Sequence, residues 1–87
     1  MQFEWDQNKN RTNKTKHGID FNTATELWND QDRIEIQMNF PAENRNALIG
    51  KVGNKLWTAI FTRRGEAIRI ISVRRARKKE THLYEQK

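Results

Sequence analysis

Residues 46–73, NALIGKVGNKLWTAIFTRRGEAIRIISV, decide the fold of this chain. Gly53-Asn54 separates two β-prone runs, which is a strong signal for a tight hairpin turn. Arg64-Gly65-Glu66 makes a second break, and the run after it carries apolar side chains on both faces, as a central strand does. The stretch therefore predicts three consecutive antiparallel strands over residues 46–52, 55–63 and 67–73.

The flanking segments extend this pattern on both sides. Residues 33–38 alternate polar and apolar side chains, which predicts a strand with one solvated face. Residues 20–28 carry apolar side chains at helical spacing after a capping residue, Asp20 or Asn22. Residues 76–86 read as a C-terminal helix, with Ala76, Leu83 and Tyr84 turned inward. The segment 39–44, which contains the only proline, is predicted to be a loop.

The N-terminal segment is harder to interpret. Residues 1–5 read as a short strand with Phe3 and Trp5 on one face. Residues 6–18 contain no aliphatic or aromatic side chain, so periodicity alone indicates a loop. However, Asp6 can cap the start of a helix and Gly18 can end it. These end signals predict a helix over this segment.

Together these elements give the order β-α-α-β-β-β-β-α. This order is typical of an α+β fold, here an antiparallel sheet with two N-terminal helices and a C-terminal helix. The chain has 87 residues and no cysteine, which predicts one domain, residues 1–87, without disulfides. No apolar run is long enough for a signal peptide or a membrane span, so we expect a cytoplasmic protein with no membrane partner.

The chain is strongly basic. It has 17 Lys and Arg against 11 Asp and Glu, a formal net charge of +6. Eight of the basic residues fall within residues 63–79, and a second cluster lies within residues 9–16. Such a balance favours an anionic partner, and guanidinium groups suit bidentate contact with phosphate. Nucleic acid is the expected partner, although the charge alone also fits a solvated surface.

Catalytic motifs of the common kinds are missing. The sequence has no phosphate-binding glycine loop, no zinc-protease helix and no nucleophile elbow. His17 and His82 lie far apart with no companion ligands, so we predict no metal and no cofactor. The remaining side chains suit cleavage of RNA by its own 2′-hydroxyl, which needs only proton transfer and cations over the phosphate.

Several segments resemble the BrnT-type toxins of bacterial type II toxin–antitoxin systems. At the N-terminus these are Phe3-Glu4-Trp5-Asp6, Lys9, Asn13, Lys16-His17-Gly18, Phe21 and Ala24. The central segment is Glu43-x-Arg45 with Leu48-Ile49-Gly50. The C-terminal signature is Arg63 or Arg64, then Ile68-Arg69-Ile70-Ile71-Ser72-x-Arg74-Arg75-Ala76, Glu80 and Tyr84. Val73 stands where the family usually has Ala.

The resemblance implies a RelE-like fold and a ribonuclease that inhibits translation by cleaving mRNA. It also implies a cognate antitoxin, BrnA-like and DNA-binding, that neutralises the toxin in a hetero-oligomer. Two other functions fit the residues as well. One is a non-catalytic nucleic-acid-binding or regulatory domain on the same scaffold, and the other is a protein–protein module that receives an acidic partner.

For the toxin function we predict that Arg74 and Arg75 clamp the scissile phosphate. In a regular strand these two side chains would point to opposite faces, with Arg69 on the face of Arg75. At least one of the pair is then structural. Lys16 and His17 are candidates for phosphate binding and acid–base chemistry, and Glu43 for a general base. The further candidates for RNA contact are Arg45, Arg63, Arg64, Arg69, Glu80 and Tyr84.

Overall fold

The computed structural model describes residues 1–38 and 44–86. Its elements follow the predicted order, with a short 3₁₀ helix (η1) after the second helix. They are β1 (Gln2–Glu4), α1 (Gln7–His17), α2 (Phe21–Ala24), η1 (Thr25–Asn29), β2 (Ile34–Met38), β3 (Arg45–Val52), β4 (Lys55–Arg64), β5 (Ala67–Arg75) and α3 (Lys78–Glu85). The α+β class is confirmed, and the order is compatible with the RelE-like fold that the resemblance implies. The predicted catalytic residue Glu43 lies outside the described residues.

The five strands form one sheet in the order β1-β5-β4-β3-β2. Strands β2 to β5 are antiparallel, and Gly53-Asn54 joins β3 to β4 as predicted. β1 pairs with β5 in parallel, so the sheet is mixed where we predicted an antiparallel one. The reason is that β1 leads directly into α1, which lies beside the second half of β5, so both strands must run the same way. β5, which contains the predicted residues 67–73, is a central strand as expected, since it pairs with β1 on one side and β4 on the other.

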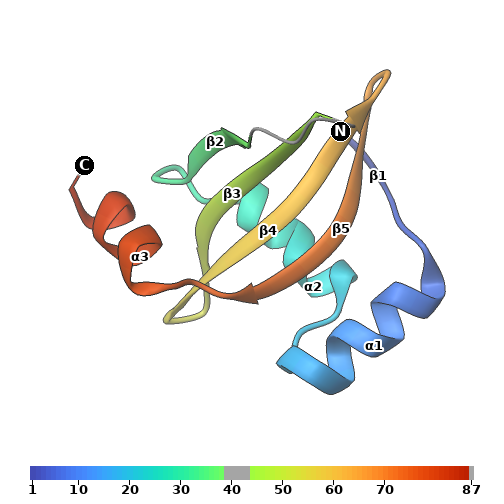
Figure 1. Ribbon diagram of the computed structural model, residues 1–87, viewed down its shortest axis with the longest axis horizontal. Helices are drawn as coiled ribbons and strands as arrows, with labels where there is room; N and C mark the ends of the chain where they lie inside the picture. The colour runs from blue at the N-terminus through green and yellow to red at the C-terminus, as the bar shows by residue number, and fades with distance from the viewer. Residues whose placement is uncertain (39–43, 87) are drawn as a thin grey trace.

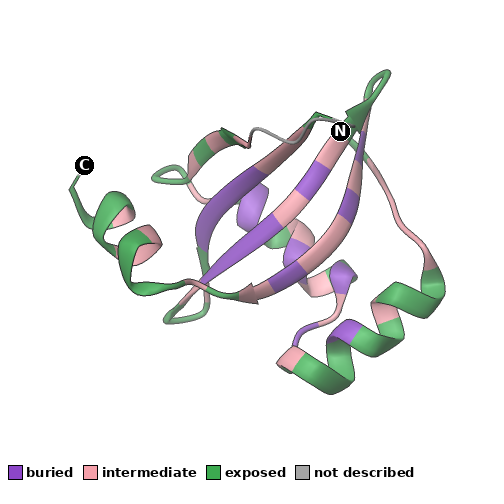
Figure 2. Ribbon diagram, viewed as in Figure 1, coloured by how far each residue is buried: buried purple, intermediate pink, exposed green. Residues whose placement is uncertain are grey.

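One face of the sheet carries the hydrophobic core. α2 and η1 lie behind this face in Figure 1, and we call it the helix face. In Figure 2 buried and half-buried residues alternate along the first part of β5, as expected when one face is covered, whereas β3 and β4 each contain a run of consecutive buried residues. At Gly50 an added Cβ would lie 3.2 Å from the Leu27 carbonyl oxygen, so glycine lets η1 approach β3 closely. The buried core comprises Ile19, Phe21, Ala24, Leu27, Trp28, Leu48, Trp57, Ala59, Phe61, Ile68, Ile70 and Val73.

β5 contains an irregularity that decides which side chains share a face. Ile60 pairs with Ser72 and Phe61 with Ile70, so Ile71 is an extra residue in β5. The shift keeps Ile70 and Val73 both on the helix face, although they are three positions apart. On the opposite face, which we call the open face, Arg69 therefore lies with Ser72 and Arg74. The expectation that Arg69 shares a face with Arg75 was wrong because it assumed a regular strand.

α1 forms although it has no apolar side chain, and it docks by hydrogen bonds. Asp6 accepts hydrogen bonds from the backbone of Asn8 and Lys9, and Gly18 ends the helix with a φ of 82°. Asn13 is buried, accepts a hydrogen bond from the Val73 N–H at 3.0 Å and donates to the Ile19 carbonyl at 2.8 Å. α1 therefore takes the place of a strand along the part of β5 that β1 leaves unpaired (Figure 1).

α3 packs against β3 from the open face. Its N-terminal end is held to β4 by a hydrogen bond of 2.9 Å from the Thr58 hydroxyl to Glu80, and Thr58 is fully buried. Its C-terminal end is held by Tyr84, whose hydroxyl donates to Asp30 at 2.8 Å. Leu83, which we predicted to face inward, is 43% exposed, because these polar contacts turn the other side of α3 towards the sheet.

Candidate functional site

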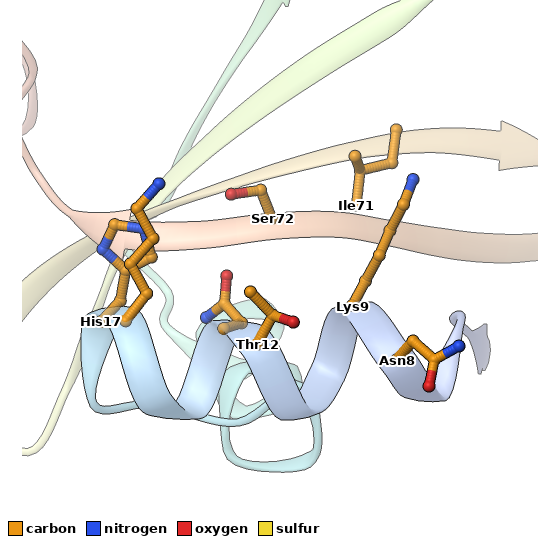
Figure 3. Close-up of a pocket in the computed structure, with 8 residues that line it drawn as sticks. Asn8, Lys9, Thr12, His17, Ile71 and Ser72 are labelled. Atoms are coloured by element: carbon orange, nitrogen blue, oxygen red, sulfur yellow. The ribbon is translucent and has the colours of Figure 1, made fainter.

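A hollow of about 280 Å³ lies between α1 and the second half of β5. We call it the α1–β5 groove. In Figure 3 the Lys9 side chain extends from α1 towards Ile71, and His17 stands at the far end of the helix. Ile71 and Ser72 lie opposite on β5. The described residues that line it are Asn8, Lys9, Thr12, Asn13, Lys16, His17, Ile71 and Ser72.

The spacing of these residues explains why they meet. Residues 9, 12, 13, 16 and 17 follow the three- and four-residue steps that place side chains on one face of a helix. Because Asn13 fastens that face to Val73, the lysines on either side of it and His17 are turned to β5. The sequence prediction had Lys16 and His17 but missed Lys9, Thr12 and Ser72. The polar stripe around Asn13 was the signal for the first two.

A second hollow, of about 470 Å³, adjoins the first and shares Lys9 and Ile71 with it. We call it the arginine pocket. Four arginines that were predicted to contact RNA line it, although the guanidinium of one of them, Arg63, lies over Phe61 on the helix face. Its lining is Lys9, Asn44, Arg45, Thr62, Arg63, Arg64, Arg69 and Ile71. None of these residues is acidic, so in the part of the chain that the structure describes the two hollows form one continuous basic surface along β5.

The arginines differ in how many of their guanidinium N–H donors are already bonded to carboxylates. Arg63 binds Glu35 with two hydrogen bonds of 2.8 Å, and its guanidinium lies over Phe61 on the helix face. This pairing lowers the pKa of Glu35. Arg69 instead gives a single hydrogen bond of 2.9 Å to Glu4. Arg64 reaches the same carboxylate only at 3.6 Å, so Arg64 and Arg69 keep donors for another anion.

Arg74 has its donors engaged by Glu80. The two side chains form hydrogen bonds of 2.7 and 2.9 Å and are only 20% and 18% exposed. The Arg74 guanidinium lowers the pKa of Glu80 to about 2. Burial opposes this shift, and hydrogen bonds from the Arg77 N–H and the Thr58 hydroxyl add to it. This arrangement fastens α3 to β4 and β5. It is the geometry of a structural ion pair more than of a phosphate clamp.

The other predicted site residues also lie apart from the groove. Arg75 is on the helix face, where it lies 5.5 Å from the Trp57 ring centroid, so Arg74 and Arg75 do point to opposite faces. Burial and the hydrogen bond to Asp30 raise the pKa of Tyr84 to about 12. Tyr84 and Glu80 thus serve the attachment of α3 in this structure.

The Glu80 pKa predicts how stability depends on pH. The folded value of about 2 lies below the ordinary 4.5, so the ion pair stabilises the fold above pH 4.5. That contribution, at most about 3 kcal/mol, is lost as the pH falls towards 2. We expect Glu80→Gln to lower Tm at pH 7, and the difference from the parent to shrink between pH 4.5 and 2. A thermal unfolding series measures it, and a difference independent of pH would contradict the ion-pair assignment.

The fold and the basic surface define a small α+β domain in which basic side chains from α1, β4 and β5 line two adjoining hollows. The chain belongs to the BrnT family, since residues 5–80 match the family described as "Ribonuclease toxin, BrnT, of type II toxin-antitoxin system". No curated protein sequence gives a significant match. Family membership makes this a ribonuclease-toxin domain, with an antitoxin as the partner that such systems contain. No helix among residues 1–38 and 44–86 is long and apolar enough to cross a membrane.

Proposed function

We propose that the protein cleaves mRNA in the α1–β5 groove by attack of the RNA 2′-hydroxyl on the adjacent phosphorus. One observation carries this proposal: α1 and β5 bring an imidazole, two ammonium groups and a hydroxyl to one hollow. These belong to His17, Lys9, Lys16 and Ser72. The structure favours this groove over the Arg74–Arg75 pair as the place of the chemistry, because Glu80 engages the donors of Arg74 and Arg75 lies on the helix face.

The groove supplies the groups that this reaction needs. The 2′-oxygen forms a bond to phosphorus while the bond to the 5′-oxygen breaks, leaving a 2′,3′-cyclic phosphate and a 5′-hydroxyl. In this scheme His17 takes the proton from the 2′-hydroxyl and delivers it to the departing 5′-oxygen, which becomes the 5′-hydroxyl. Lys9 and Lys16 stabilise the extra negative charge on the phosphate oxygens. Ser72 donates a hydrogen bond to the same oxygens.

The donor set of the groove suits phosphate better than a divalent cation. The described residues of its lining include no carboxylate, and its ammonium groups repel a cation. Within the described part of the chain, no group of three or more His, Cys, Asp or Glu side chains could hold a metal ion. The protein's own cations therefore take the charge-stabilising role in the proposed reaction.

We expect the purified chain to cut RNA at an undiminished rate in excess EDTA, leaving cyclic phosphate ends. Gel analysis of the products, with end groups identified by mass, measures this. A control with a magnesium-dependent ribonuclease confirms that the chelator is effective. Loss of cleavage with EDTA and recovery with Mg²⁺ would contradict the mechanism. Binding of RNA without any cleavage would instead support the non-catalytic nucleic-acid-binding function.

We also propose that a BrnA-like antitoxin neutralises this chain by covering the open face and the groove. Charge alone would place this partner over the strands at Arg63, Arg69 and Arg75. Only Arg69 of these lies on the open face, whereas Arg63 and Arg75 are on the helix face. A partner that blocks the reaction would therefore lie over Arg69, Ser72 and the exposed side of α1.

A further inference from the structure

We infer that the arginine pocket is a second phosphate site, which holds the RNA backbone beside the phosphate that is cut. The inference rests on the proposed function, since it extends the substrate path from the α1–β5 groove. The two hollows meet at Lys9 and Ile71. Ser72 lines the first and Arg69 the second, so the path follows β5 for three residues, roughly 10 Å. An RNA strand lying in the groove therefore continues into the pocket.

The charges in the pocket support an anionic occupant. Arg64 and Arg69 share one carboxylate, that of Glu4, at 3.6 and 2.9 Å. One negative charge between two guanidiniums leaves a net positive charge, and most of their N–H donors remain for phosphate oxygens. The side chains are also reachable, since Arg64 is 60% and Arg69 33% exposed. Thr62, beside Arg69 in the β4–β5 pairing, adds a hydroxyl donor.

The lining also indicates which part of the RNA is recognised. Among residues 1–38 and 44–86, no Phe, Tyr or Trp lines the two hollows, and the aromatic rings of Trp28, Trp57 and Phe61 belong to the core. Bases of single-stranded RNA are usually held by stacking on such rings. Contacts to phosphate alone position a strand without reading its sequence. The pocket therefore selects for an extended single strand rather than for a base.

The test compares substrates with and without a second phosphate. Parent and Arg69→Gln proteins are assayed on a mixture of dinucleoside monophosphates, which have only the scissile phosphate, and on a mixed-sequence oligoribonucleotide. We expect Arg69→Gln to lower kcat/KM about tenfold on the oligonucleotide and to leave the dinucleotide rate unchanged. The salt dependence of oligonucleotide cleavage should also lose about one unit of slope. Arg33→Gln, a loss of charge at an exposed residue outside both hollows, is the matched control.

The possible outcomes separate this inference from the proposed function. An equal loss on both substrates, or no loss on either, would overturn the second phosphate site. If Arg69→Gln impairs only antitoxin binding, the pocket is a protein interface and the inference is also overturned. If the parent cuts nothing, the proposed function fails. Weaker binding of a 2′-deoxy oligonucleotide by Arg69→Gln than by Arg33→Gln would then still support the phosphate site.

Discussion

Replacement of His17 by glutamine is expected to lower the single-turnover rate of RNA cleavage by about 10²–10⁴-fold. This is the usual contribution of a positioned group that transfers a proton in the transition state. His17 lies in the last turn of α1, next to Lys16 and across from Ser72, and is the one imidazole in the groove lining. Rapid-quench cleavage at saturating protein measures the chemical step separately from binding.

The matched control is His82→Gln, because His82 is the other histidine of the chain and lies exposed on α3, bonded to Gln86. It should cut RNA at the parent rate. Removing His17 also removes a basic group from a helix C-terminus, which costs at most about 1 kcal/mol on an exposed helix end. Circular dichroism should therefore show a folded protein. Parent-rate cleavage by folded His17→Gln would show that the chemistry lies elsewhere.

The ends of the elements were largely predictable from the sequence, because local signals set them. Asp6, Asp20 and Gly18 act as the caps that their residue types indicate. The Gly53-Asn54 turn also lies where predicted. In each case the residue acts on its own backbone or on residues two to four positions away. Such short-range interactions can be predicted from the order of the residues alone.

The faces of β5 were not predictable, because the extra residue at Ile71 has no local signal. The strand accommodates both the pairing with β4 and the hydrogen bond from Val73 to Asn13 on α1. Only the packed structure shows that making both contacts requires the pairing of β5 with β4 to shift by one residue. Since a strand alternates with period two, one extra residue exchanges the faces of all that follows. That is why Arg69 and Arg75 separate.

The sequence indicated a basic candidate site, but it identified only some of the residues that line it. Charge indicated a candidate surface for phosphate, and the Lys16-His17 pair lies in the α1–β5 groove. Arginine count alone could not show which guanidiniums are already paired. Glu35 lies far along the chain from its partner Arg63, and Glu80 lies on a different element from its partner Arg74. Each glutamate accepts hydrogen bonds from two donors of its arginine. The availability of an arginine is thus a property of the fold.

Arg74→Gln and Glu80→Gln are each expected to destabilise the fold by about 2–3 kcal/mol. Removing one partner of a largely buried ion pair leaves the other charge without compensation. The loss should stay below that of a fully buried pair, since both side chains are about one-fifth exposed. For a domain of this size the change corresponds to a fall in Tm of about 10–20 °C. Chemical and thermal unfolding at pH 7 measure it.

A double-mutant cycle distinguishes this structural role from the phosphate clamp predicted from the sequence. If Arg74 acts through Glu80, the double variant should be less destabilised than the sum of the two single changes, by about 1–2 kcal/mol. Cleavage by the folded fraction should then stay near the parent rate in all three variants. If Arg74 instead stabilises the transition state, Arg74→Gln should lose about 10²–10³ in rate, while Glu80→Gln, which frees the guanidinium, should keep activity. A rate loss of that size with a Tm like the parent's would return the chemistry to Arg74 and contradict the α1–β5 groove.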